Sequence, residues 1–391
     1  MNRNLDFEDT RPYNDEEMPE AIRRVSENVH FSEIIKYIFP DADLHTFTEE
    51  FRKIKTVNEF QIQIMDKAIR TIVNQTADGL SSSMPKTLTN EKKYMFISNH
   101  RDILLDSAIL QIILHEQGLQ TTEITFGSNL MSSPFIIDIG KMNKMFKIVR
   151  GGTMKEIFSN SLKVSQYMRY AITQKHQSTW IAQRNGRAKN GFDATEVGVL
   201  KMFAMSSSAD FVSNLMELNI TPVAISYEYE PCDFLKAREL YISKRKPYIK
   251  DAGEDMLSIA RGVKQWKGHI HLAICETISE EELKHCDTFL HNEKFKSLGR
   301  IIDNKIYQNY KLWKTNYIAH DILHNTNTYT SCYSKEEKAA FKLYMSNGLK
   351  EIEGDTKELE TIFLQIYATP VDNCYSVQLY KRNLTEKTQN E

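Results

Sequence analysis

The sequence predicts an α/β fold, in which helices flank a central sheet that is mixed or mostly parallel and helical additions lie at both ends of the chain. Two observations predict it. Between residues 94 and 280, six short apolar runs each stop at a polar or glycine-containing break, and helix-like segments separate several of them. The segments on either side are charged and helix-like. We therefore expect an N-terminal helical region over 1–85, an α/β domain over 94–280 and a C-terminal helical extension over 281–391.

The N-terminal region divides into three parts. Residues 1–20 are polar and are expected to be loosely ordered. Residues 31–78 contain frequent good helix formers among spaced apolar residues, which predicts helices. Residues 79–93 are rich in Gly, Ser, Pro and charge, and this composition predicts a linker.

The α/β domain is expected to contain six strands. Residues 94–98 (YMFIS) are nearly all apolar, as buried strands are. In the last predicted strand Ile270, Leu272 and Ile274 alternate, which places them on one face. Helices are expected over 153–175 and 195–217. The predicted strands lie within 94–98, 124–129, 146–152, 178–191, 219–231 and 269–278.

Composition excludes several classes of protein. Among 391 residues, 50 Lys and Arg stand against 52 Asp and Glu, whereas a dedicated nucleic-acid binder usually carries a basic excess. No apolar run approaches the roughly 18 residues of a membrane-spanning helix, and the acidic N-terminus has no apolar core of a secretory signal. Five scattered cysteines fit a reducing compartment. The expected location is the cytoplasm, and peripheral contact with the inner face of the membrane stays open.

The sharpest local signal is SNHRDILLD, in which His100 is followed by Asp102 and Asp106. A carboxylate that accepts the Nδ1–H of a histidine fixes its tautomer and favours the imidazolium form. The free Nε2 can then deprotonate a hydroxyl group. The alternative is that His100 is a loop histidine and Asp102 is a helix N-cap.

A second signal is the placement of cations where predicted strands end. Arg150 precedes Gly151, while Arg184, Arg187 and Lys189 surround Gly186. Glycine allows a ligand to approach the backbone, and arginine matches the geometry of phosphate oxygens. Ligands of open α/β sheets bind beyond the carboxyl ends of the strands, so these residues predict an anion site. The alternative is that they are solvated loop charges.

Together these segments resemble the glycerophospholipid acyltransferase family, the PlsC-like enzymes that acylate glycerol phosphate or lysophosphatidate. The resemblance covers about 94–280 in four ordered blocks: SNHRDILLD, FKIVRGG, WIAQRNGRAK and ITPVAISYEYEP, the last containing Pro222. SNHRDILLDSAIL, IAQRNGRAK and ISYEYEPCDFLKAREL look most like a bacterial branch of predicted soluble acyltransferases. The fold that this resemblance implies is that of glycerol-3-phosphate acyltransferases.

The resemblance implies a mechanism and its partners. His100 would act as general base, so that an acceptor hydroxyl attacks an acyl thioester of coenzyme A or acyl-carrier protein, with backbone N–H groups near the glycine turns holding the oxyanion. The expected acceptor is glycerol 3-phosphate or a lysophospholipid, bound at a peripheral membrane surface. No metal, cofactor or nucleic acid is expected. The implied substrate-binding residues are Arg150, Gly151, Arg184, Asn185, Gly186, Arg187, Lys189 and Pro222.

Two departures from the family pattern keep alternatives open. The acid follows the histidine at x5 rather than x4, so either Asp106 or Asp102 could orient His100, and Asp106 is favoured. Asn185 replaces the expected glutamate, which keeps open a different amino- or hydroxy-lipid acceptor. Hydrolysis and a non-catalytic lipid- or CoA-binding role are further alternatives.

A histidine pair, a cysteine and a basic segment could also have a function, but each has a simpler structural explanation. His269 and His271 have the spacing of paired metal ligands, but the sequence offers no obvious third ligand, so metal binding is the minor reading. Cys232 has no histidine tied to it and is expected to be structural. The basic segment 243–250 is either a solvated loop or a contact for anionic lipid headgroups.

Overall fold

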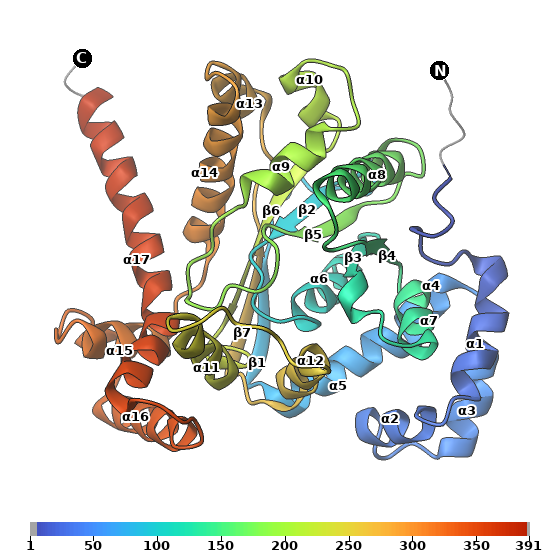
Figure 1. Cartoon of the computed structure of the whole chain (residues 1–391), viewed down its shortest axis with the longest axis horizontal. Helices are drawn as coiled ribbons and strands as arrows, with labels where there is room; N and C mark the ends of the chain where they lie inside the picture. The colour runs from blue at the N-terminus through green and yellow to red at the C-terminus, as the bar shows by residue number, and fades with distance from the viewer. Residues whose placement is uncertain (1–5, 389–391) are drawn as a thin grey trace.

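The computed structural model describes residues 6–388, with side chains over residues 6–376. A seven-stranded sheet crosses its centre in the order β1-β7-β6-β2-β5-β3-β4 (Figure 1). Neighbouring strands are parallel except β6 and β7, which are antiparallel, so the sheet is mixed and mostly parallel. The strands are β1 (Gly79–Ser83), β2 (Met95–Ser98), β3 (Glu123–Gly127), β4 (Met145–Ile148), β5 (Thr179–Ala182), β6 (Ile220–Tyr227) and β7 (His269–Ile274).

The predicted fold class is confirmed, and β2 to β7 overlap the six predicted segments, with β3 and β4 each beginning one residue earlier than predicted. The prediction of a linker is wrong for residues 79–83, because these residues form β1 at the edge of the sheet. They pair with the first five residues of β7. The three serines of β1 are exposed, which is why this strand carries no apolar signal. The domain limits stay a prediction. The first strand of the sheet begins at residue 79, within the predicted N-terminal region 1–85.

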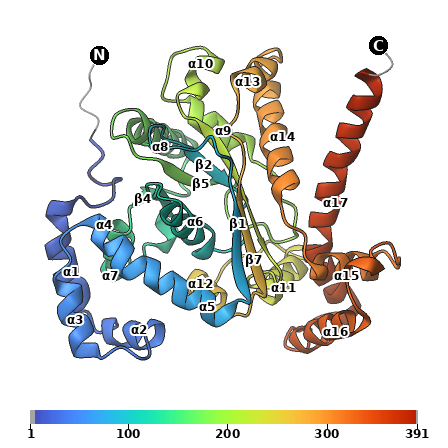
Figure 2. The ribbon, with the colours of Figure 1, turned by 180° about the vertical axis from the view of Figure 1, so that it is seen from behind.

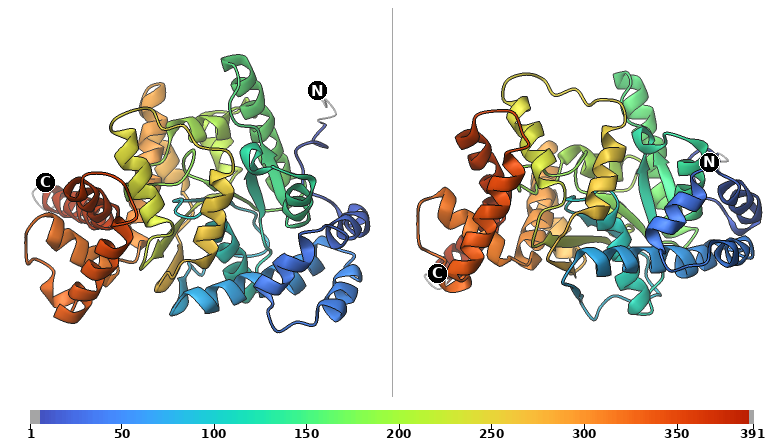
Figure 3. Two further views of the ribbon diagram at one scale, coloured as in Figure 1. Left: turned by 60° about the horizontal axis from the view of Figure 1, so that its bottom comes forward. Right: turned by 90° about the horizontal axis from the view of Figure 1, so that it is seen from below.

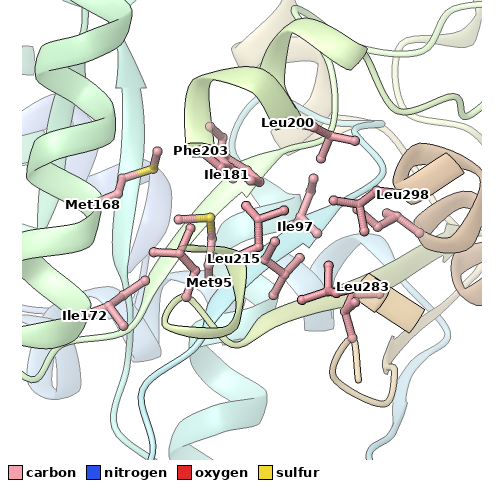
Figure 4. Packing of buried hydrophobic residues seen from close by; sticks show 14 of the residues in the cluster. Met95, Ile97, Met168, Ile172, Ile181, Leu200, Phe203, Leu215, Leu283 and Leu298 are labelled. Atoms are coloured by element: carbon pink, nitrogen blue, oxygen red, sulfur yellow. The ribbon is translucent and has the colours of Figure 1, made fainter. Parts of the chain in front are cut away.

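Helices cover both faces of the sheet. Because side chains alternate along a strand, Met95 and Ile97 of β2 face one layer and Phe96 faces the other. Figure 4 shows Met168 and Ile172 beside Met95 and Ile97 in the first layer. That layer contains α8 (Met154–Thr173), α9 (Val197–Ala204), α10 (Phe211–Met216), α13 (Glu280–Asp287) and α14 (Asn292–Asn309).

The opposite face packs against α5 (Lys67–Thr76) and α6 (Leu105–Glu116). Burial of apolar side chains on both faces explains why the central strands are almost wholly apolar. The predicted alternation is confirmed, since Ile270, Leu272 and Ile274 are all buried in this second layer. The predicted helix over 195–217 is two helices, α9 and α10. The connecting helices are η3 (Ser128–Leu130), α7 (Pro134–Met142), α11 (Asp233–Ser243) and α12 (Glu254–Lys264).

The N-terminal helices form a separate apolar cluster with α7. The expectation that residues 1–20 are loosely ordered is wrong for the described residues 6–20, because Met18 begins α1 and is fully buried. Residues 1–5 lie outside the described residues. The helices are η1 (Asp15–Glu17), α1 (Met18–Ser26), α2 (Phe31–Ile38), α3 (Leu44–Arg52), α4 (Val57–Phe60) and the π-helical turn η2 (Gln61–Asp66).

The C-terminal helices lie on the side of the sheet-containing centre opposite to the N-terminal helices (Figures 2 and 3). Their apolar side chains form a cluster of their own, joined by α11. Among the described helices, none is long and apolar enough to cross a membrane. The helices are α15 (Lys314–Leu323), η4 (Thr330–Cys332), α16 (Lys335–Leu349) and α17 (Thr356–Thr388).

Candidate active site

A cavity of about 350 Å³ lies where the parallel strands β2, β3, β4 and β5 end. Since these strands run in one direction, their carboxyl ends meet at the same edge of the sheet. The segments that follow them bring five predicted site residues to the cavity wall. These are His100, Arg150, Gly151, Arg184 and Asn185.

The imidazole of His100 is held by Asp106, in the first turn of α6. His100 Nδ1 lies 2.9 Å from Asp106 Oδ2, and this oxygen also accepts the backbone N–H groups of Arg101 (2.6 Å) and Asp102 (2.9 Å). The two backbone N–H groups already make this oxygen a hydrogen-bond acceptor. Nδ1 of His100 must therefore carry the hydrogen of the ring and donate it to the same oxygen. His100 therefore has Nε2 as the ring nitrogen available to the cavity.

Asp102 has a different position. Its Oδ1 accepts the N–H groups of Leu104 (2.9 Å) and Leu105 (2.8 Å), which are donors at the start of α6. Burial, and then the nearby Asp106 carboxylate, raise the pKa of Asp102. Asp102 therefore binds backbone N–H groups at the start of α6, although the N-cap residue is Leu104, whereas Asp106 is the carboxylate that contacts the ring of His100.

Two aromatic residues surround this pair. Tyr227 of β6 donates its hydroxyl hydrogen to Asp106 Oδ1 at 2.8 Å, and burial raises the pKa of Tyr227 well above its ordinary value. The indole of Trp180 lies edge-on to the His100 ring, with centroids 6.1 Å apart, and its N–H bonds to Ser98. The carboxylate of Asp106 is thus held by hydrogen bonds on both of its oxygens, which limits the freedom that the pair would lose during a reaction.

Arg150 and Arg184 are the cations of the cavity. The described residues place no carboxylate within 4.0 Å of either guanidinium group. Burial lowers the pKa of Arg150, and the Nε of Arg184 is buried without a hydrogen-bond partner. Arg150 nevertheless remains exposed to solvent, and Nη1 of Arg184 donates to the carbonyl of Phe192 at 3.5 Å. The Nε of Arg184 is therefore the guanidinium atom that lacks an acceptor, and an anionic ligand in the cavity would supply one.

The rest of the cavity wall is mainly apolar. Side chains from β3, β4, β5, α8, α9 and α12 contribute, so the cavity extends from the polar residues over a hydrocarbon-like surface. A ligand that matches this wall carries an anionic or polar group and an apolar chain. The apolar side chains of the wall include Ile124, Phe126, Met145, Ile148, Ile157, Ile181, Met202 and Ile259.

The other predicted binding residues lie outside the described lining of the cavity. Arg187 is almost completely buried, and Ala188 beside it donates its N–H to the carbonyl of His100. Lys189 forms an ion pair with Glu239. Gly186 forms a turn with a positive φ of 78°, and Pro222 lies inside β6. The substrate-binding role of these four residues stays a prediction.

A buried ionic network beneath the cavity carries no signal in the sequence. Arg101, next to His100, is fully buried and pairs with Asp193 and, at 3.4 Å, with Glu230. Lys236 of α11 donates to Glu230 and to the carbonyl of Arg101, at 2.5 and 2.8 Å. The network ties the loop after β2 to segments about 90 and 130 residues away, and only the tertiary fold brings these charges together.

Two glycines without a sequence signal allow close contacts around the cavity. A Cβ atom at Gly127 would lie 2.6 Å from the Asn129 side chain and 3.1 Å from Arg150 Nε. A Cβ atom at Gly262, on α12, would lie 2.1 Å from Asp102 Oδ2. A side chain at either position would therefore displace the neighbouring polar side chain, Asn129 in the first case and Asp102 in the second.

Groups of side chains that could approach a metal ion lie away from the cavity. Among the described residues they are His320, His324 and Asp372, and Asp78, Glu228 and His269. His269 Nδ1 is hydrogen-bonded to Glu228 at 2.7 Å, and His271 Nδ1 to Ser81 at 2.8 Å. The Nδ1 of His320 is buried without a partner, whereas a metal-bound histidine normally has its second nitrogen hydrogen-bonded. His269 thus lies beside two carboxylates that its sequence spacing did not reveal, Asp78 and Glu228, and His271 belongs to neither group.

No protein-family model matches the chain, and no curated protein sequence matches it. Among solved structures, the chain is similar to the crystal structure of the 1-acyl-sn-glycerophosphate (LPA) acyltransferase PlsC from Thermotoga maritima. The identity is 9%, the match covers 74% of this chain and 91% of that chain, and the TM-score is 0.39. A likeness of this size does not assign the chain to a family.

Proposed function

We propose that this chain is an O-acyltransferase that moves a fatty acyl group from an acyl thioester to the hydroxyl of glycerol 3-phosphate or a lysophospholipid. The observation that carries the proposal is the content of one cavity. It combines an imidazole held by a carboxylate, two guanidinium groups without carboxylate partners among the described residues, and a long apolar wall. These parts match a base, an anionic acceptor and an acyl chain.

In the proposed reaction His100 is the general base. Its Nε2 takes the proton of the acceptor hydroxyl, and the hydroxyl oxygen attacks the thioester carbonyl carbon. The tetrahedral intermediate collapses, the carbon–sulfur bond breaks, and the thiolate takes the proton from the imidazolium. Asp106 stabilises the imidazolium through the 2.9 Å contact with Nδ1. The products are an ester and a free thiol, of coenzyme A or acyl-carrier protein.

The two arginines would position the acceptor beside His100. Arg150 and Arg184 would bind the phosphate of the acceptor, because arginine donates two parallel hydrogen bonds to phosphate oxygens. The acyl chain would lie along the apolar wall formed by β3, β4 and α8. This arrangement holds both substrates within reach of His100, which supplies much of the rate by proximity.

A different amino- or hydroxy-lipid acceptor is the second candidate. Asn185 lines the cavity and is an uncharged group where the resembling family has a carboxylate. An amide both donates and accepts hydrogen bonds, so it suits a neutral polar group on the acceptor.

The test is release of free thiol from a long-chain acyl-coenzyme A by the purified chain, with and without glycerol 3-phosphate or lysophosphatidate. We expect release that depends on the acceptor and is abolished in His100→Ala. His115→Ala is the matched control, because His115 is half-exposed in the last turn of α6 and lies outside the cavity lining. Release without an acceptor would indicate hydrolysis instead. No release with acyl-coenzyme A or an acyl-carrier-protein donor would overturn the proposal.

A further inference from the structure

Large apolar side chains are exposed on two segments beside the cavity. Val149 follows β4, and Met154, Ile157 and Phe158 lie on the first turns of α8. Met154 is 83% exposed and Phe158 63% exposed. In a helix the spacings i, i+3 and i+4 share a face, so these three side chains form one apolar strip. Burying such side chains is normally favourable, and several of them exposed together indicate an interaction surface.

The second segment is the start of α12, where Met256 and Leu257 are exposed. The loop after β3 joins this helix to the first segment, because Asn129 donates a hydrogen bond of 2.7 Å to Asp255, and Ser128 beside it accepts the backbone N–H of Arg150 at 3.1 Å. Ile259, one turn further along α12, lines the same cavity as Val149 and Ile157. The six exposed residues, which we call the mouth patch, therefore flank the opening of the cavity that holds His100.

The charges beside the β4–α8 part of the mouth patch are mainly positive, whereas beside α12 Lys250 stands against Asp251, Glu254 and Asp255. Two of these carboxylates are already engaged, Asp255 by Lys250 and Glu254 by the hydroxyl of Tyr248. From β4 to the start of α8 the chain carries Lys147, Arg150 and Lys155 against the single carboxylate of Glu156. That carboxylate is engaged at the N-terminus of α8, where it accepts a backbone N–H at 2.7 Å. Apolar side chains that project between cations are complementary to a bilayer with anionic headgroups, since the chains enter the acyl boundary and the cations remain at the phosphates.

We propose that the mouth patch docks on an anionic phospholipid membrane surface, so that the cavity opens toward the bilayer. This inference rests on the proposed function and deepens it, because it states that the lipid substrate enters from the membrane. An acidic carrier protein would be attracted by the same cations. The exposed Met, Phe and Leu side chains favour the bilayer, because insertion buries them completely.

The experiment is flotation of the purified full chain with vesicles of phosphatidylcholine alone or with 30 mol% phosphatidylglycerol. The variants are Met154→Asp and Phe158→Asp. Leu343→Asp is the matched control, because Leu343 is 61% exposed on α16, which lies far from α8 (Figure 1). We expect wild type and the control to bind the anionic vesicles. Phe158→Asp should bind about 10- to 100-fold more weakly, as expected for losing one buried aromatic side chain.

Three outcomes would overturn the inference: wild type that stays unbound, Phe158→Asp that binds like wild type, or equal loss in the Leu343→Asp control. Binding of an acidic acyl-carrier protein through the mouth patch, with no vesicle binding, would also overturn it. Vesicle binding requires no turnover, so it is judged separately from the enzyme activity. Thiol release with glycerol 3-phosphate in the absence of vesicles tests the proposed function in the same variants, and we expect it to be unchanged in Phe158→Asp.

Discussion

Replacing Asp106 by asparagine tests the role of this carboxylate in the proposed mechanism. In serine proteases the same Asp→Asn change lowers kcat about 10⁴-fold, because the wrong imidazole tautomer results. In this chain Oδ2 of Asp106 accepts three N–H groups, from the ring of His100 and from two backbone amides, while Oδ1 accepts the hydroxyl of Tyr227. An amide NH2 cannot face three donors, so the amide oxygen must take the Oδ2 position. Its NH2 then faces the Tyr227 hydroxyl, which can accept.

The tautomer of His100 is therefore kept in Asp106→Asn, and only the negative charge is lost. A hydrogen bond to a charged group contributes about 1.5–3 kcal/mol, against about 1 kcal/mol for a neutral pair. The difference of about 0.5–2 kcal/mol in the transition state lowers kcat about 2- to 30-fold. This is a smaller loss than the tautomer error causes.

The assay is acceptor-dependent thiol release at saturating acyl-coenzyme A, with thermal unfolding to show that the variant folds. Asp102→Asn is the control, because the Oδ1 of Asp102 only accepts two backbone N–H groups at the start of α6, which an amide oxygen does equally well. We expect the control to keep kcat within about threefold, since Asp102 does not contact the ring. A loss of about 10⁴-fold in Asp106→Asn would contradict the donor argument. A larger loss in Asp102→Asn than in Asp106→Asn would refute the assignment of the orienting carboxylate.

Further predictions address the anion site and the stability of the fold. Arg150→Gln and Arg184→Gln should each raise KM for a phosphorylated acceptor about 10-fold or more, by loss of a charge-assisted hydrogen bond, and an unchanged acceptor KM in both would exclude phosphate binding there. Gly262→Ala should lower the free energy of unfolding by about 1–3 kcal/mol, because its Cβ would lie 2.1 Å from Asp102 Oδ2; urea denaturation at wild-type stability would contradict this contact. Burial raises the pKa of Asp303 to about 7, so its contribution to stability is fully present below pH ~4 and is lost as pH rises through 7. Asp303→Asn should therefore reduce the fall in stability between these pH values, and an unaltered pH profile would show that Asp303 is not the titrating group.

The central strands could be predicted because a strand that is buried on both faces is apolar at almost every position, and such a run is visible in the sequence. The segments around Phe96 and Ile225 are almost wholly apolar, so the sequence alone indicates a buried sheet. Strand β1 has no such run, because its serines are exposed and it is held by pairing with β7. The start of α1 does carry a pattern, with Met18, Ile22 and Val25 at helical spacing, but it follows an acidic segment that indicates disorder.

The candidate site was predictable in part for the same reason. Residues that directly follow buried strands, such as His100, Arg150 and Arg184, meet at one edge of a parallel sheet, and the structure places them around one cavity. Arg187 is only three residues beyond Arg184 but is buried away from the lining, because the direction of a loop side chain depends on the turn. The pairing of Arg101 with Glu230 joins residues that are 129 positions apart, which no local spacing reveals.

The most direct test of the account is to identify the product formed from palmitoyl-coenzyme A and glycerol 3-phosphate by mass spectrometry. We expect an acylated glycerol phosphate in amounts equal to the released thiol, and none with His100→Ala. Free palmitate as the sole product would contradict acyl transfer and show that the cavity activates water instead.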